Sequence, residues 1–196
     1  MLLSPAGPPA VGPGTIHRPG AHTRSGHAMG RTRLGLLAGA AGAFADHGVR
    51  RSTMQSIAAA AGVAKATLYN HFRTKDDVIT ALVRAELERL TAVAASLALE
   101  QALATLSDEL GAHPVLRRLA ESEPDVLNAL LSAATDTWDH LTARLAQALR
   151  VDADSAELAA QWLLGVILQP GRSTARHRHA ARLAAVLTPD ASAGPA

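Results

Sequence analysis

The sequence predicts an all-α protein of about nine helices, and three observations carry that prediction. No segment alternates convincingly between apolar and polar residues with the period of two that a strand requires. Helix-breaking clusters interrupt the helical patterns at residues 111–114, 122–124, 151–154 and 169–173. The segment from Ser52 to Asp77 has the pattern of a short helix, a glycine turn, a second short helix and the capped start of a third. This last pattern is a helix-turn-helix and indicates DNA binding.

The beginning of the chain is predicted to lie outside the folded part. Residues 1–28 contain five Pro and five Gly and few residues that could form a core, so we expect a disordered tail. The apolar start Met1–Leu3 is too short for a signal-peptide core, and Met29 is a candidate alternative start. The apolar run 34–45 is shorter than the ~20 residues of a membrane span. We therefore expect a cytoplasmic protein with no membrane segment, and the absence of cysteine allows that location.

A first helix is predicted over the apolar run that contains Ala41 and Phe44. Three glycines, Gly35, Gly39 and Gly42, lie within it, and each costs roughly 0.5 to 1 kcal/mol relative to Ala. They either weaken the helix or permit another helix to pack closely against it. The sequence leaves both readings open.

Local signals define the helix-turn-helix. Ser52 followed by Gln55 fits a capping box, which predicts a helix that starts near Thr53. Gly62 accepts the left-handed conformation that ends a helix, and Val63 is expected to plug the turn into the core. Further along the chain, the pair Thr74–Asp77 repeats the capping pattern and predicts the start of another helix.

The second short helix, which begins near Lys65, has one apolar face and one small, polar face. Leu68 and Phe72 share the apolar face and are expected to pack inward. The opposite side could enter a major groove, where Asn and Thr hydrogen-bond base edges and Ala contacts a thymine methyl. That side consists of Ala66 and Asn70, with Thr67 and Tyr69 at its flanks.

Positive charge is concentrated around this motif. Residues 29–90 hold nine Lys and Arg against five Asp and Glu, whereas residues 91–196 hold eight against twelve. A basic module on an acidic body is the charge distribution expected of a protein that meets DNA at one end. Candidate phosphate contacts are Lys65, Tyr69, His71 and Lys75, and Arg31 and Arg33 are candidates for a basic arm.

Residues 31–90 resemble the DNA-binding domain of the TetR (tetracycline-repressor) family of bacterial transcriptional regulators. The resemblance rests on Ala41, Phe44, Gly48, Thr53, Ile57–Ala58, Ala61–Val63, Thr67–Tyr69, His71–Phe72 and Lys75. It implies that Thr53, Lys65, Tyr69, His71 and Lys75 contact phosphates and that Ala66, Thr67 and Asn70 face bases. Two positions depart from the family pattern, because Ala64 replaces a helix-capping Ser and Ala66 a frequent Gly. Loss of that cap costs about 1 kcal/mol.

The rest of the chain is predicted to be a helical regulatory and dimerisation domain over residues 91–188, after a DNA-binding domain over residues 29–90 and before a disordered tail at residues 189–196. The stretch 161–168 is apolar nearly all round, which suits either an ordinary buried helix or a dimer seam. The resemblance favours the seam and implies a four-helix bundle formed with the last helix, 174–187, of each subunit. A two-fold dimer reads a palindrome through half-sites about 34–36 Å apart or a multiple of that distance.

Clues to a small ligand are few. Large or polar side chains in the otherwise Ala- and Leu-rich helices could line a pocket, and they are more often core or surface residues. The scarcity of aromatic residues suggests that any cavity is aliphatic and suits an apolar ligand. These candidate ligand-binding residues are Trp138, His140, Gln161 and Trp162.

No cofactor or metal site is predicted. His177 and His179 are two positions apart on a predicted helix, so their side chains point in different directions and a metal would need a third ligand from elsewhere. The chain has no Walker A loop, HExxH motif or nucleophile elbow, so we expect no enzyme activity.

The sequence thus predicts a homodimeric repressor that binds double-stranded DNA at a palindromic operator and is released by a small, apolar inducer. A transcriptional activator of the same family and a helical interaction module that has lost specific DNA reading are the alternatives, and Ala64 and Ala66 leave the second one open.

Overall fold

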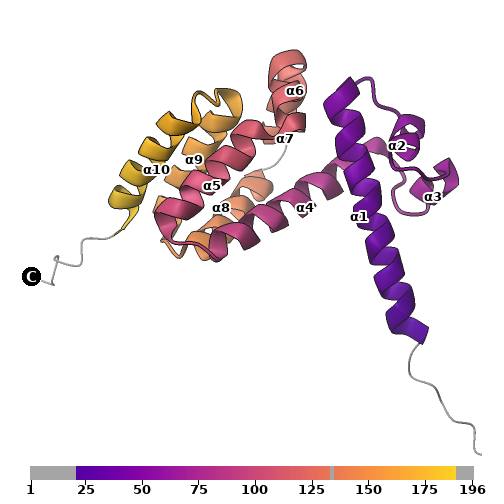
Figure 1. Ribbon diagram of the computed structural model, residues 1–196, viewed down its shortest axis with the longest axis horizontal. Helices are drawn as coiled ribbons and strands as arrows, with labels where there is room; N and C mark the ends of the chain where they lie inside the picture. Colours follow the sequence, from indigo (N-terminus) through magenta and orange to yellow (C-terminus); the bar gives the residue numbers. More distant parts are fainter. Residues whose placement is uncertain (1–20, 133–134, 189–196) are drawn as a thin grey trace, which may run out of the picture.

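The computed structural model describes residues 21–132 and 135–188. In this part of the chain there are ten α-helices and no strand, which confirms the predicted all-α class (Figure 1). The helices are α1 (Ala21–His47), α2 (Met54–Ala60), α3 (Lys65–Tyr69), α4 (Lys75–Ala95), α5 (Leu99–Ala112), α6 (Pro114–Ser122), α7 (Pro124–Ser132), α8 (Thr135–Leu149), α9 (Ala153–Leu168) and α10 (Ser173–Leu187).

Two expectations differ from this arrangement. The tail predicted over residues 1–28 is helical from Ala21, because the last proline before α1 is Pro19 and nothing after it prevents a helix. An unpredicted turn also separates α4 from α5. The Ser96 hydroxyl donates to the Val93 carbonyl oxygen at 2.7 Å and ends α4 without a Gly or Pro signal. Residues 1–20 and 189–196, the remaining predicted tails, lie outside the described ranges.

One core packs the amino-terminal helices together with α6 and α7. Its buried residues come from α1 to α4, where they include Phe44, Ile57 and Leu68, and also from α6 and α7. Leu119 of α6 and Leu127 of α7 belong to it and are almost fully buried. The helix-turn-helix therefore rests partly on helices that follow it by more than forty residues in the sequence.

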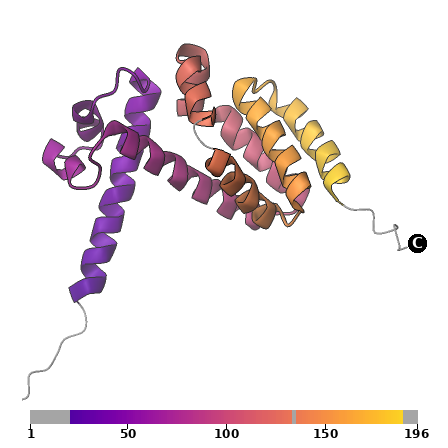
Figure 2. The same cartoon turned by 180° about the vertical axis from the view of Figure 1, so that it is seen from behind.

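A second core lies at the other end of α4 and is built from α5, α8, α9 and α10. Leu90 and Ala94, near the end of α4, pack into it with Leu103 of α5 and Leu163 of α9. In both views α4 runs from the helix-turn-helix to this helical body, with α6 and α7 lying between α1 and the body (Figures 1 and 2). Within the described ranges, no helix combines the length and apolarity needed to cross a membrane.

Candidate nucleic-acid interface

Helix α2 begins at a capping box that lies one residue later than the one predicted. The Ser56 amide donates to the Thr53 hydroxyl at 3.1 Å, and the Thr53 amide donates to the Ser56 hydroxyl at 2.9 Å. Ser52 does not cap the helix, because its side chain is buried and its hydroxyl donates to the Gly48 carbonyl oxygen at 2.6 Å. The predicted Ser52–Gln55 box is therefore wrong: Ser52 ties the end of α1 to the loop before α2.

The turn between α2 and α3 has the geometry that its sequence predicts. Gly62 has φ of +66°, in the left-handed region. Its amide donates to Ala59 at 3.0 Å, and the Val63 amide donates to Ala58 at 3.0 Å, which is the Schellman pattern that ends a helix. Val63 packs against the first core as expected, so the turn fixes the direction in which α3 leaves.

Helix α1 supports this motif through a close contact. A Cβ atom on Gly39 would lie 2.4 Å from the Ala61 Cα, so only glycine allows the two backbones to approach this closely. Gly35 and Gly42 have no such neighbour, and the close-packing reading therefore holds for one of the three glycines. Nearer the start of α1, the Arg33 guanidinium lies 4.6 Å from the centre of the Phe72 ring, a cation–π contact that links α1 to the segment between α3 and α4.

Helix α3 and the three residues that follow it have the two faces that the helical periodicity predicts. Leu68 and Phe72 are buried. The other side of this segment is open to solvent or half-buried and carries most of the predicted DNA-contacting residues. These are Lys65, Ala66, Tyr69 and Asn70, which are exposed, and Thr67 and His71, which are half-buried.

The amino-terminus of α3 lacks a side-chain cap. Ala64 occupies the N-cap position with φ of −66° and ψ of 145°, and no side chain accepts a hydrogen bond from the first turn. A Ser, Thr, Asn or Asp at this position would normally satisfy one of these amides. The departure noted in the sequence thus corresponds to a missing capping interaction in the structure.

Helix α4 starts with the predicted Thr74–Asp77 capping box. The Asp77 amide donates to the Thr74 hydroxyl at 3.1 Å, and the Thr74 amide donates to the Asp77 carboxylate at 3.0 Å. Hydrogen bonds from Thr74, through its backbone first and then its side chain, lower the pKa of Asp77 below its usual value. Asp77 therefore stays ionised at neutral pH and anchors the start of α4.

The Lys75 ammonium takes part in a contact that the sequence did not predict. Its Nζ donates to the Val49 carbonyl oxygen in the α1–α2 loop at 2.8 Å, and the side chain is half-buried. An ammonium has three N–H donors, so a phosphate can still be bound alongside this carbonyl. Lys75 thus joins the start of α4 to the loop that precedes Thr53.

The remaining residues predicted to contact DNA lie on α1, at the start of α2 and on α3. Thr53 is exposed at the start of α2, and Arg33 is exposed on α1. Arg31 lies in α1, but its side chain falls outside the described part. Lys65 and Tyr69 lie next to each other on α3, with Nζ 5.6 Å from the ring centre.

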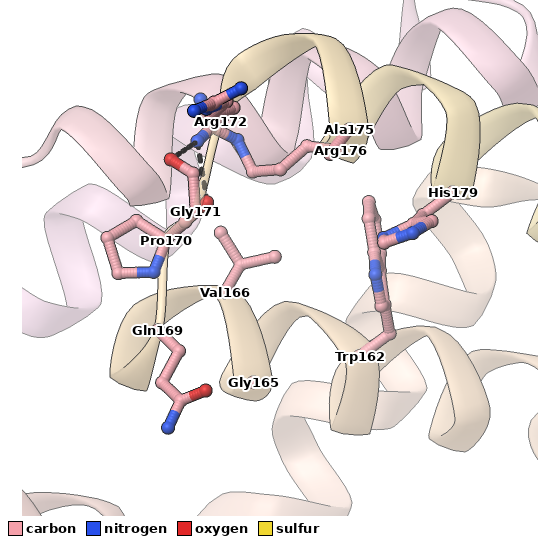
Figure 3. A pocket seen from close by; sticks show the side chains of 10 residues that line it. All are labelled: Trp162, Gly165, Val166, Gln169, Pro170, Gly171, Arg172, Ala175, Arg176 and His179. Carbon is pink, nitrogen blue, oxygen red and sulfur yellow. Dashed lines mark hydrogen bonds between the residues drawn. The ribbon is translucent and has the colours of Figure 1, made fainter.

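The four candidate ligand-binding residues do not line a common cavity. Trp138 packs against the second core, His140 is exposed, and Gln161 is exposed and donates to Glu157 at 3.2 Å. Only Trp162 lines a described pocket, an open depression of about 220 Å³ between α9 and α10 (Figure 3). There it lies beside His179, with Arg172 and Arg176 at the other end. Sequence periodicity did not reveal which way each of these helices faces.

Helix α9 is buried on one side only. Its inner face includes Ala159 and Leu163, whereas Leu158 and Leu168 keep 44% and 48% of their surface exposed. On the neighbouring α10, Val186 is 73% exposed. Helices α9 and α10 lie side by side at the end of the body away from α1 (Figure 2). Each of them carries exposed apolar side chains.

A polar cluster that the sequence analysis missed joins α10 to α5. Asp108 accepts hydrogen bonds from the Ser173 hydroxyl at 2.8 Å and the Arg176 guanidinium at 2.7 Å, and its other oxygen lies 2.5 Å from His177 Nε2. This is not a catalytic triad, because Ser173 is turned to the carboxylate and is 3.4 Å from the same His nitrogen. Partial burial would raise the pKa of Asp108, but these hydrogen bonds, led by the one with His177, lower it to about 2.

Comparison with known proteins agrees with the fold and with the amino-terminal motif. Residues 36–82 match the sequence model of a family described as bacterial regulatory proteins, tetR family. Over 144 residues the chain is 32% identical to the HTH-type transcriptional repressor Rv1474c of Mycobacterium tuberculosis, an alignment that covers 68% of this chain and 63% of that protein. A stretch of 72 residues is 39% identical to the HTH-type transcriptional repressor KstR2 of Rhodococcus jostii and covers 37% of this chain and 34% of that protein. The chain thus spans less than two thirds of the length of these relatives.

Two solved structures share the arrangement of helices. The TetR family repressor AlkX from Dietzia sp. superposes with a TM-score of 0.59 at 22% identity, over 79% of this chain and 94% of that one. The fatty acid degradation regulator FadR from Bacillus halodurans superposes with a TM-score of 0.53 at 20% identity, over 78% and 94%. A helix-turn-helix packed on a helical body places the chain in the class of helix-turn-helix proteins. Within that class, residues 36–82 match the TetR family of bacterial regulatory proteins, and the described part of the chain shares the fold of a TetR family repressor.

Proposed function

We propose that this protein is a homodimeric transcriptional repressor that binds a palindromic operator and is released by a small, apolar ligand. The observation that carries DNA binding is the surface of α3. A buried Leu68 and Phe72 hold the helix in place while the small and polar side chains Ala66 and Asn70 face outward. Such a surface fits a major groove, where an Asn side chain can pair with adenine.

The contacts around α3 support a phosphate clamp on both sides of the groove. Lys65 and Tyr69 flank the exposed face, and Thr53 and Lys75 start the two neighbouring helices. Phosphate contacts of this kind fix the position of a protein on a duplex, whereas base contacts give sequence preference. The proposed division of roles is therefore Asn70, Thr67 and Ala66 for bases and the flanking residues for phosphates.

Dimerisation is proposed through the outer face of α9 and α10. Leu158 and Leu168 are exposed there although α9 is otherwise strongly apolar, and a second copy would bury them. The same face contains the depression beside Trp162, which a partner would cover. Two copies would then present two α3 helices to successive major grooves.

The inducer is proposed to act by preferring a conformation in which these two helices no longer match the grooves. Such an effect requires a difference in affinity between the two conformations of about 1–3 kcal/mol. An apolar ligand suits the aliphatic second core, in which Leu103, Leu145 and Leu163 predominate. A thermal-shift screen tests its chemistry, and stabilisation by strongly polar metabolites alone would contradict this part of the proposal.

The deciding experiment is selection of bound fragments from random and genomic DNA by the purified full chain, followed by affinity measurements against salt. We expect palindromic fragments that bind at least about 10³-fold more tightly than bulk DNA. Uniform, steeply salt-dependent binding with no preferred fragment would instead favour a module that binds only phosphates.

The missing cap at Ala64 is the observation that keeps a helical interaction module as the second candidate. Transcription from a reporter that carries the selected fragment distinguishes repression from activation.

A further inference from the structure

A buried carboxylate from the carboxy-terminal half of the chain holds the loop that precedes the helix-turn-helix. Glu123, between α6 and α7, accepts hydrogen bonds from the Val49 amide at 2.9 Å and from the Arg50 amide at 3.2 Å. Within the described part of the chain, Glu123 is the one charged residue that is buried, with 7% of its surface exposed. A buried carboxylate is costly unless it is hydrogen-bonded, and the hydrogen bonds from these backbone amides offset that cost.

The backbone around Gly48 is shaped to receive this carboxylate. Gly48 has φ of +80°, which turns the following amides toward Glu123. A Cβ atom at position 48 would lie 2.4 Å from Glu123 Oε1, so the approach requires a residue without a side chain. A conformational requirement and a steric requirement for glycine therefore coincide at one residue.

The same loop contacts Lys75 and leads into Thr53, two of the residues proposed to contact DNA. Val49 donates its amide to Glu123 and accepts, through its carbonyl oxygen, the Lys75 ammonium at 2.8 Å. Four residues after Val49, Thr53 caps α2. Val49 therefore connects Glu123 to Lys75 at the start of α4. Glu123 also lies against the short segment that leads into α2.

Packing of α6 and α7 in the first core fixes the position of Glu123. Leu119 and Leu127, on either side of Glu123, are buried in the first core, and the Glu123 carbonyl oxygen accepts the first hydrogen bond of α7 from the Leu127 amide at 3.1 Å. An exposed ion pair joins Arg50 to Asp125 beside it. Exposed pairs contribute little, so the buried Glu123 contact dominates the attachment.

We propose that Glu123 is a positioning residue that holds the α1–α2 loop, and with it Thr53 and Lys75, in the geometry that reads DNA. This inference rests on the proposed DNA-binding function and adds a route by which a shift of α6 and α7 reaches the helix-turn-helix. A displaced Glu123 frees the Val49 and Arg50 amides, and the loop then samples other conformations. DNA reading weakens without any change in a residue that touches DNA.

The test compares Glu123→Gln with Glu121→Gln in the full chain. Gln keeps the size of Glu but turns one acceptor oxygen into an NH₂ group, which faces a backbone N–H. Glu121 is the matched control, because it is exposed on α6 and its one ion pair within the described residues is with Arg117 of the same helix. Thermal unfolding confirms that both variants are folded at the temperature of measurement.

Two readouts are needed. Hydrogen exchange of the Val49 and Arg50 amides, followed by NMR, reports whether the loop is held, and we expect it to accelerate about tenfold or more in Glu123→Gln. The ratio of affinities for the fragment selected by the wild-type protein and for mixed-sequence duplex reports DNA reading. Phosphate contacts from Thr53 and Lys75 fix the position of α3 on the duplex, and only the selected fragment depends on that position, so we expect the ratio to fall about three- to tenfold. Glu121→Gln is expected to match the wild type in both.

Unchanged exchange at Val49 and Arg50 in Glu123→Gln would overturn the proposal, and so would faster exchange with an unchanged affinity ratio. An equal loss of both affinities would also overturn it, because a purely structural defect lowers the amount of folded protein and leaves the ratio alone. Failure of the proposed function is distinguishable from these results. It is seen in the wild-type protein, which would then select no fragment, whereas failure of this inference is seen in the comparison of the two variants.

Discussion

Asn70 is the residue for which base reading can be tested most directly. It is exposed at the end of α3, on the side opposite the buried Leu68 and Phe72. We expect Asn70→Ala to change which fragments are selected and to cost about 1–3 kcal/mol of discrimination at one base pair, because a bidentate contact to adenine is lost. Repeating the selection with the variant checks this. An unchanged preference would remove Asn70 from the base-reading residues.

Two lysines near α3 should differ in what their removal does. Lys65 is exposed and contacts only the Tyr69 ring among the contacts described, whereas Lys75 donates to the Val49 carbonyl oxygen. We expect each change to Ala to flatten the slope of log affinity against log salt by about one. Lys75→Ala should in addition lower the free energy of unfolding by about 1 kcal/mol, because a hydrogen bond that is partly shielded from water is lost.

Salt-dependent binding and urea unfolding, measured on both variants, separate these effects. Equal stability of Lys75→Ala and Lys65→Ala would show that the contact with Val49 contributes nothing to folding. An unchanged salt slope in either variant would take that lysine out of the phosphate contacts.

At the scale of single elements, the uncapped start of α3 is open to improvement. Ala64 already has the extended backbone of an N-cap residue, so a hydroxyl placed there can accept an amide hydrogen bond. We expect Ala64→Ser to raise the free energy of unfolding by about 1 kcal/mol. Urea unfolding is the measurement, with Ala60→Ser inside α2 as the control that adds a hydroxyl without a cap. A stability no greater than that of the control would mean that α3 needs no cap.

The polar cluster between α5 and α10 makes stability depend on pH. The pKa of Asp108 is lowered from 3.8 to about 2 in the folded protein. A lowered folded-state pKa stabilises the fold above the unfolded-state value, so this contribution is complete above about pH 4 and is lost as the pH falls toward 2. The carboxylate is 40% exposed, and solvent screening keeps the effect modest.

We therefore expect Asp108→Asn to be less stable than the wild type at neutral pH and the difference to shrink as the pH falls from about 4 to about 2. Thermal unfolding across this range measures it, with Asp46→Asn, at an exposed position on α1, as the control. A difference that stays constant with pH would show that the ionised carboxylate does not stabilise the contact with α10.

Elements governed by neighbouring residues could be predicted from the sequence, and those governed by distant ones could not. The Gly62 turn and the Thr74–Asp77 cap depend on residues within a few positions of each other, and both were predicted correctly. The capping box of α2 was displaced by one residue because the burial of Ser52 depends on the end of α1 folding over it. The contact of Glu123 with Val49 joins residues 74 positions apart in the sequence, and no local sequence pattern predicts it.

At the scale of the whole molecule, the exposed apolar side of α9 governs the expected assembly. Leu158→Glu would place a charge within the proposed dimer interface, so we expect dissociation to monomers and a large loss of affinity for a palindromic fragment. Analytical ultracentrifugation of the purified protein measures the state of assembly. Val83→Glu is the matched control, because Val83 is a similarly exposed apolar residue on α4, 50% exposed against 44%. Persistence of a dimer in Leu158→Glu would exclude this face as the interface.

The ligand candidates are a case where whole-molecule geometry overrides sequence pattern. Gln161 and Trp162 are adjacent in sequence, yet the Gln side chain is exposed beside Glu157 while the Trp side chain lines the depression on α9 and α10. The direction in which each helix faces depends on how it packs against its neighbours, and composition does not contain that information.

Because α4 belongs to both cores, it can act as a lever arm. Val78 is buried in the first core and Ala94 in the second, at opposite ends of one helix of 21 residues. Such a helix is about 32 Å long, so each degree of tilt about one end moves the other by about 0.5 Å. In a dimer the displacements of the two ends add, and a tilt of a few degrees changes the span between two α3 helices by several ångströms. A small repacking of the second core that leaves the protein folded would therefore produce a larger displacement of α3 on the DNA.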